Sequence, residues 1–169
     1  MDEATLEKMR RQSGLTLTRD GELMYGGRPV QHPRVVDLFH RGIEVRADGD
    51  VTLTVGRAWC YLAVEGVARF GMRLAADRLT LLDGRELAPA ECGVAYGPDD
   101  RFYVWHPSLR GPVVLLREAH QALAGVWGGD RMPPFRALVR LDAIPGPADP
   151  WPAESKPLEP DLGAELNRA

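Results

Sequence analysis

Short runs of alternating apolar and polar residues, separated by glycine turns, recur along most of this sequence and constrain its fold more than any other feature. Alternation with a period of two is typical of a strand with one buried face. Asp20-Gly21 and Asp48-Gly49 each fall between two such runs, and Asp-Gly is a strong signal for a β-hairpin turn. The pattern predicts hairpins or strands over residues 14–31, 43–55, 59–64, 70–74, 79–82, 94–105 and 113–116.

Three segments carry a helical pattern instead. Residues 2–12 are mostly charged and predict a short, frayed helix, and residues 33–40 begin with Pro33, a residue that is favoured in the first helical turn. In residues 117–127 the apolar positions recur at helical spacing before Gly128-Gly129. Residues 135–141 fit either a short helix or a strand. Together with the hairpins, these helices predict an α+β fold.

A glycine followed by an alternating strand occurs four times, at Gly14, Gly42, Gly71 and Gly93. The spacing fits internal duplication, and it equally fits the rhythm of consecutive hairpins. A duplication would give two tandem strand-rich subdomains. The predicted division is an N-terminal arm (1–13), a first subdomain (14–75), a second subdomain (76–142) and a proline-rich tail (143–169).

The tail holds six prolines between positions 145 and 160. Because each proline removes a backbone donor, we expect an extended, mobile segment. It is either a plain disordered end or a docking peptide in which Trp151 is an exposed anchor for a partner.

Composition excludes several classes of protein. The formal net charge of −3 argues against non-specific binding of nucleic acid. No apolar run approaches the roughly 20 residues of a membrane helix, so we expect no membrane insertion. The first residues lack the apolar core of a signal peptide, which favours a cytoplasmic location. Two cysteines, Cys60 and Cys92, do not make a disulfide framework, and we expect both thiols to be buried and inert.

Known catalytic and cofactor motifs are missing from the sequence. The histidines do not have metal-ligand spacing, no Gly-x-Ser-x-Gly elbow is present, and no glycine-rich phosphate loop joins a strand to a helix. We therefore expect no metal and no cofactor, and we assign no catalytic residue.

Two groups of residues are candidates for ligand binding. Arg57, Arg69 and Arg73 would hold an anionic ligand if they converged on one face of the sheet, and otherwise form a solvated strand face. The segment 105–112 brings Trp105, His106 and Arg110 close to one turn. That combination suits the stacking of a ligand, and it also fits a packed loop with a buried tryptophan.

Several short motifs resemble a bacterial family known as domain of unknown function 1285. They are Arg19-Asp20-Gly21, Gly27-Arg28-Pro29-Val30, 35–39, Val64-Glu65-Gly66, 79–87 and 113–119. The resemblance implies two similar α+β subdomains, the second like a pleckstrin-homology barrel with a closing helix. It also implies a ligand site between the subdomains and a role in signal transduction, without enzymatic activity.

The sequence also departs from this family at polar positions. Residues 55–59 lack the family's Glu and Lys, residues 82–85 are a reduced form of its Thr-Asn-Val-Gly-Asp, and Gly66 replaces an Asp. Only Arg19, Asp20 and Glu65 carry over as matching polar residues.

Three functions remain as hypotheses. The first is a bacterial binding or regulatory module with a site for a small anionic ligand or a protein partner between the subdomains. The second is an adaptor that binds a protein through a sheet edge or the tail. The third is a small hydrolase, which requires His32, His40 or His106 within hydrogen-bond reach of a carboxylate in a pocket.

Overall fold

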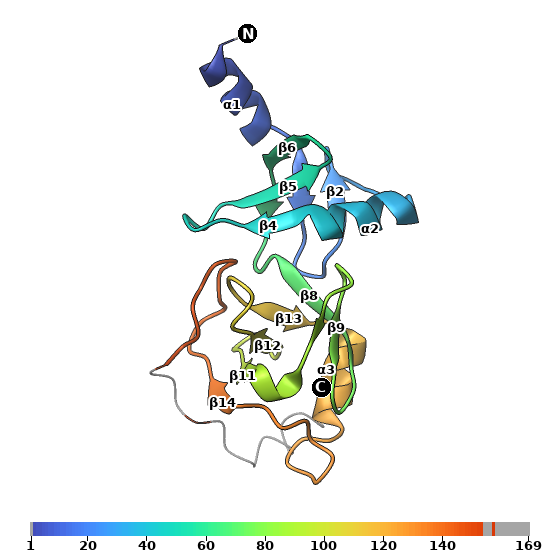
Figure 1. The fold of residues 1–169 in the computed structure, drawn as a ribbon, viewed down its shortest axis with the longest axis vertical. Helices are drawn as coiled ribbons and strands as arrows, with labels where there is room; N and C mark the ends of the chain where they lie inside the picture. The colour runs from blue at the N-terminus through green and yellow to red at the C-terminus, as the bar shows by residue number, and fades with distance from the viewer. Residues whose placement is uncertain (1, 154–156, 158–169) are drawn as a thin grey trace.

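The computed structural model describes residues 2–153 and 157, and it shows a strand-rich α+β protein with three sheets. The predicted fold class is confirmed. Figure 1 shows two halves along the long axis, with β8 at the edge of the lower half where the two meet. The first half contains α1 (Glu3–Arg11), β1 (Leu15–Leu17), β2 (Leu23–Tyr25), β3 (Arg28–Pro29), α2 (Pro33–Gly42), β4 (Ile43–Val45), β5 (Val51–Val55), β6 (Ala58–Tyr61) and β7 (Ala63–Val64). The second half contains β8 (Arg69–Leu74), β9 (Leu79–Leu81), β10 (Glu86–Leu87), a 3₁₀ turn (Pro89–Glu91), β11 (Gly93–Tyr96), β12 (Phe102–Trp105), β13 (Val113–Leu115), α3 (Arg117–Ala124) and β14 (Ala137–Arg140).

The first half is built from the two predicted hairpins. β1 and β2 pair across the Asp20-Gly21 turn, and β4 and β5 pair across Asp48-Gly49. The resulting sheets have the orders β3-β2-β1-β7 and β4-β5-β6. Between the hairpins, α2 starts at Pro33 as expected and packs against β5 (Figure 1).

The second half is one curled sheet of seven strands in the order β10-β9-β8-β13-β12-β11-β14. The predicted helix after the last hairpin is α3, which packs against β8 and β13. β8 pairs in parallel with β13 and antiparallel with β9, so hydrogen bonding assigns residues 69–74 to this sheet. The division predicted between residues 75 and 76 follows the glycine repeat, which carries no information on this long-range pairing.

The two halves share one apolar core. Leu17, Ile43 and Leu53 of the first half belong to the same buried cluster as Phe70 and Tyr103 of the second. A separate cluster lies within the second half, where Phe102 and Leu123 are fully buried. Because the first cluster crosses between the sheets, neither sheet has an independent core of its own on that side.

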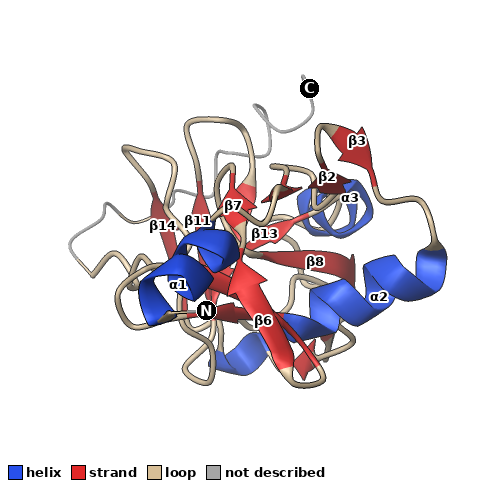
Figure 2. Cartoon of the chain, turned by 90° about the horizontal axis from the view of Figure 1, so that it is seen from above, coloured by secondary structure: helices blue, strands red, loops and turns tan. Residues whose placement is uncertain are grey.

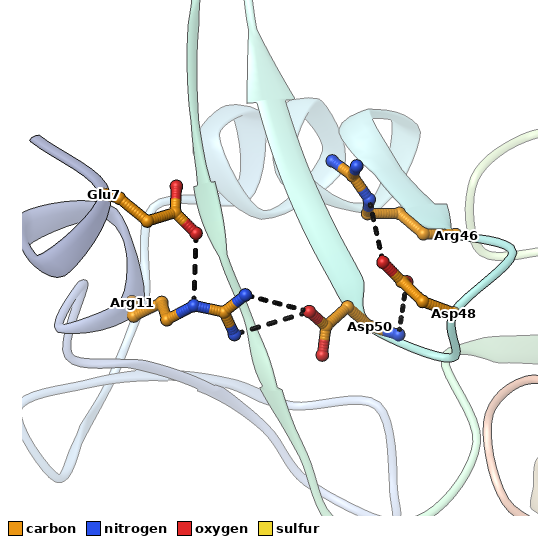
Figure 3. A network of polar contacts seen from close by, with 5 residues as sticks. All are labelled: Glu7, Arg11, Arg46, Asp48 and Asp50. Atoms are coloured by element: carbon orange, nitrogen blue, oxygen red, sulfur yellow. Dashed lines mark hydrogen bonds and ion pairs between the residues drawn. The ribbon is translucent and has the colours of Figure 1, made fainter. Parts of the chain in front are cut away.

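The N-terminal helix is held to the first half by charged and aromatic side chains. Arg11 pairs with Glu7 of its own helix and reaches Asp50 on the β4–β5 turn, at 3.1 and 3.3 Å (Figure 3). Its guanidinium carbon also lies 3.9 Å from the ring centroid of Tyr61. The view in Figure 2 shows α1 beside β6. The segment is a helix, as predicted, but its last turn is anchored.

Residues 143–153 differ from the predicted extended, mobile tail. They have no regular structure, in keeping with their prolines, yet Pro145 is buried and Ala148 and Trp151 pack against the shared core. The backbone of Pro147 lies so close to Gly111 that a Cβ there would overlap it. The rest of the predicted tail, residues 154–156 and 158–169, lies outside the described residues. Within the described part of the chain, no helix is long and apolar enough to cross a membrane.

Candidate functional site

The residues matched to the family motif meet where the two halves join. The Arg101 guanidinium donates to the Arg19 carbonyl oxygen at 2.9 Å and to Asp20 Oδ1 at 2.7 Å, and Arg19 Nε donates to the Glu65 carbonyl oxygen at 3.2 Å. The cavity beside Arg19 and Glu65 has a volume of about 10 Å³. A single water fits such a space and a ligand does not.

Two buried polar groups lie close to this junction. Tyr103 donates its hydroxyl to Asp99 Oδ2 at 2.7 Å, and burial together with this carboxylate raises the pKa of Tyr103. Arg69, only 8% exposed, donates from Nη1 to the Arg110 carbonyl oxygen at 3.2 Å, and burial lowers the pKa of its guanidinium. Arg69 therefore ties β8 to the loop that precedes β13.

The three arginines that would form an anion site if they converged on one face do not meet. Arg57 is exposed in the turn between β5 and β6, in a different sheet from the other two. Arg73 is exposed and pairs with Glu118 of α3 at 3.3 Å. Arg69 and Arg73 lie on one strand, but a β-bulge between Gly71 and Arg73 breaks the alternation that would have put them on one face.

A groove of about 590 Å³ lies at another place, on the second half beside the segment 148–151. Its lining includes the predicted Trp105 and His106, and with them Glu91, Arg110, Arg136 and Trp151. The volume is in the usual range for small-molecule sites. The cavity beside the residues matched to the family is thus small, whereas the 105–112 segment borders an open groove.

Two tryptophans form an aromatic corner of this groove. Trp105 ends β12 and donates its indole N–H to the Asp149 carbonyl oxygen at 2.9 Å. Trp151 meets it edge to face, with 5.5 Å between ring centroids. The Trp151 ring lies over Gly93, where a Cβ would overlap it. Trp151 is therefore half-buried rather than an exposed anchor, because its ring packs against Trp105 and over Gly93.

His106 is held in one orientation by three hydrogen bonds. Its Nε2 lies 2.9 Å from Glu91 Oε2, and its Nδ1 lies 2.7 Å from Ser108 Oγ. The Ser108 backbone N–H also donates to Nδ1, at 3.1 Å. Nδ1 must therefore be the unprotonated nitrogen, which leaves the Nε2 proton to donate to Glu91.

The other histidines considered from the sequence do not form such a contact. His32 is exposed at the start of α2 and makes no side-chain cap bond. His40 is buried against Phe70, and burial lowers its pKa. Of the three histidines in the hydrolase hypothesis, His106 is the one with a hydrogen bond to a carboxylate among the described residues.

Arg110 and Arg136 supply positive charge to the groove. Both are exposed, and within residues 2–153 and 157 neither guanidinium forms an ion pair. The sequence placed Arg110 beside Trp105 and His106 but gave no indication of Arg136. The parallel pairing of β14 with β11 brings Arg136 there, with its backbone N–H bonded to the Cys92 carbonyl oxygen at 2.8 Å.

Metal ligands do not gather anywhere in the described part of the chain: no group of three His, Cys, Asp or Glu side chains is positioned to hold an ion. The groove consequently offers aromatic rings, an imidazole, a carboxylate and two guanidinium groups. The aromatic rings suit the stacking of a flat ring, and the two guanidinium groups suit the binding of an anion.

Two bacterial proteins of known structure are similar to this chain. One is a DUF1285 family protein from Silicibacter pomeroyi DSS-3, which is 18% identical with a TM-score of 0.52, over 67% of this chain and 68% of that one. The other is a DUF1285 family protein from Shewanella baltica OS155, 14% identical with a TM-score of 0.48, over 67% of this chain and 91% of that one. No family model and no curated protein matches the sequence. The first of these likenesses confirms, at the level of the fold, the resemblance drawn from the sequence motifs.

Proposed function

We propose that this chain is a binding module whose groove takes a small anionic ligand that carries a flat ring. One observation carries the proposal: Arg110 and Arg136, two guanidinium groups without an ion pair among the described residues, line the same groove as Trp105 and Trp151. An arginine that is not already neutralised by a carboxylate is available for a phosphate or carboxylate of a ligand.

The volumes of the cavities favour the groove, rather than the junction of the two halves, as the ligand site. The groove measures about 590 Å³, against about 10 Å³ for each of the cavities beside Glu65 and beside Arg69. The polar groups at the junction are also occupied, because Arg101 already bonds to Arg19 and Asp20. A ligand there would have to replace these bonds, whereas the groove is open as it stands.

The proposal can be tested by titration, with the heat of binding as the measurement. Phenyl phosphate and adenosine monophosphate are the probes, with phenol and adenosine as uncharged counterparts. We expect saturable binding of the phosphates and a loss of about tenfold in affinity for Arg110→Gln and for Arg136→Gln, since hydrogen bonds to charged groups contribute about 1.5–3 kcal/mol.

Arg57→Gln is the matched control, because Arg57 is equally exposed but lies in another sheet. It should bind both phosphates as the unsubstituted chain does. Equal affinity for phenol and phenyl phosphate would contradict the anionic part of the proposal, and failure of every probe to bind would contradict the proposal as a whole.

A role in bacterial signal transduction extends this proposal, and its support is the family resemblance alone. A ligand sensor would pass on the occupancy of its groove, and the segment 148–151 is placed to respond because it forms one wall. The adaptor hypothesis has less support, since Trp151, its proposed anchor, packs against Trp105.

A further inference from the structure

Ser108, His106 and Glu91 form a continuous chain of hydrogen-bonded side chains at the edge of the groove. The hydroxyl of Ser108 lies 2.7 Å from Nδ1 of His106, and Nε2 of His106 lies 2.9 Å from the Glu91 carboxylate. A hydroxyl, an imidazole and a carboxylate in this order are the parts of a nucleophilic triad.

The hydrogen-bond arrangement of His106 suits the role of a general base. Because the Ser108 backbone N–H donates to Nδ1, that nitrogen presents a lone pair toward the serine. The proton on Nε2 then faces Glu91, which would stabilise the positive charge that develops when Nδ1 takes up a proton. In familiar serine hydrolases the two ring nitrogens have the opposite assignments, but both are competent bases.

The surroundings are those of a reaction site rather than a closed core. Ser108 is exposed, while its neighbours Pro107 and Leu109 and its partner His106 line the groove. The His106 side chain is only 10% exposed, which limits competition from water for its hydrogen bonds. Arg110 follows two residues later and lines the same groove.

We propose that Ser108 is the nucleophile of a serine esterase site, with His106 as its general base and Glu91 as a positioning residue. This activity goes beyond the ligand binding proposed above and does not depend on Arg136 or on an anionic ligand. The substrate class is a small carboxylic ester whose acyl or alcohol part carries a flat ring that the aromatic corner accommodates.

The reaction balances with water as the second substrate. Ser108 Oγ attacks the ester carbonyl carbon and its proton passes to His106 Nδ1. The bond to the alcohol oxygen breaks, and the same proton passes from Nδ1 to the departing alcohol, which leaves an ester of Ser108. Water then attacks this ester through the same base, which releases the carboxylic acid and restores the serine. When Nδ1 carries the proton it no longer accepts from the Ser108 N–H, which becomes free to stabilise the oxyanion.

A fluorophosphonate probe tests the nucleophile directly, because it forms a P–O bond to an activated serine with loss of fluoride. The chain has only three serines, Ser13, Ser108 and Ser155, so mass spectrometry of peptides assigns the adduct unambiguously. We expect one adduct, on Ser108, together with hydrolysis of p-nitrophenyl acetate. Ser108→Ala should abolish both, and Ser13→Ala should change neither.

His106→Asn tests the loss of the general base without the loss of the turn at Ser108. An asparagine oxygen also accepts the N–H of the residue two positions on, so the turn is kept while the base is lost. We expect this variant to fold with an unchanged melting temperature and to label about 100-fold more slowly or less. Glu91→Gln should slow labelling, and Glu91→Asp should restore part of the rate.

An unlabelled Ser108 in the unsubstituted chain, or a labelling rate that His106→Asn leaves unchanged, would overturn the esterase proposal. Neither result bears on the binding of phenyl phosphate, which is measured separately with the arginine variants. Binding without labelling would leave the ligand-binding proposal in place and remove the esterase. Labelling of Ser108 without binding of phenyl phosphate would leave the esterase proposal in place and remove the ligand-binding proposal.

Discussion

Gly93 provides the space in which Trp151 lies. A Cβ at this position would overlap the six-membered part of the Trp151 ring. Gly93→Ala should therefore destabilise the fold by about 1–3 kcal/mol, in the range of overpacking a well-filled site. In a chain that already carries Trp151→Ala the clash is absent, and the same substitution in a strand should stabilise by about 0.5–1 kcal/mol. Urea unfolding of the two single variants and the double variant measures this coupling. If the changes in the free energy of unfolding of the two single variants added up to that of the double variant, the Trp151 ring would not lie over Gly93.

Two histidines, the buried His40 and the half-buried His120, give the protein a defined response to acid. Burial lowers the pKa of His40 and of His120 below the ordinary value of 6.5, and at His120 the charge of Arg101 lowers the pKa further. Just below pH 6.5 the unfolded chain thus binds more protons than the folded chain, so the free energy of unfolding decreases as the pH falls from 6.5 toward the lowered values.

The melting temperature should accordingly be level between pH 7 and 8 and should fall below about pH 6.5. His40→Gln and His120→Gln should each reduce the slope of melting temperature against pH in the acid range. His32→Gln, at an exposed position, should leave the slope as it is. An acid slope that persists unchanged in the His40 and His120 double variant would show that other groups cause it.

At the scale of elements, the local sequence pattern predicted the hairpins, whose strands are neighbours in the sequence. The turns at Asp20-Gly21 and Asp48-Gly49 fix their hairpins through their own backbone preferences, and both hairpins were predicted from them. The parallel pairs β1–β7, β8–β13 and β11–β14 join strands that are distant in sequence, and alternation does not say which strand lies beside which.

The same limit explains the candidate site. Trp105, His106 and Arg110 were predicted together because they are neighbours in the sequence. Glu91 and Arg136 join them only through the pairing of β11 with β12 and β14. Trp151 was noticed but was placed in solvent, because prolines signal irregular structure without indicating whether it packs.

The N-terminal helix should depend on its two arginines for attachment. The guanidinium carbon of Arg10 lies 4.1 Å from the ring centroid of Trp59, and Arg11 makes the corresponding contact to Tyr61 as well as its bond to Asp50. α1 buries no residue, so little else holds it. In Arg10→Gln/Arg11→Gln, amide hydrogen exchange in α1 should rise about tenfold, since these contacts are at exposed sites and are individually weak.

Exchange in β5 should stay unchanged in that variant, because β5 lies within two strand pairs and under α2. Lys8→Gln on the same helix is the matched control. If the amides of α1 exchanged as slowly in the double variant as in the unsubstituted chain, the helix would be held by something other than these contacts.

At the scale of the molecule, the shared core predicts that the two halves unfold together. Phe70 is the first apolar residue of β8 and is 1% exposed. Although its strand belongs to the second sheet, its ring lies against the Gly21 turn and meets His40 edge to face at 6.2 Å. Removing the ring therefore takes contacts away from both halves at once.

Phe70→Ala should destabilise the protein by about 3–5 kcal/mol. The loss should appear equally in hydrogen exchange of β5 in the first half and of β12 in the second, and calorimetry should still show a single transition. Leu38→Ala is the control, since Leu38 is 48% exposed on α2 and its truncation should cost about 0.5 kcal/mol or less. Two separate transitions in the unsubstituted chain, or a Phe70 effect confined to β12, would instead indicate that the two halves unfold as independent subdomains.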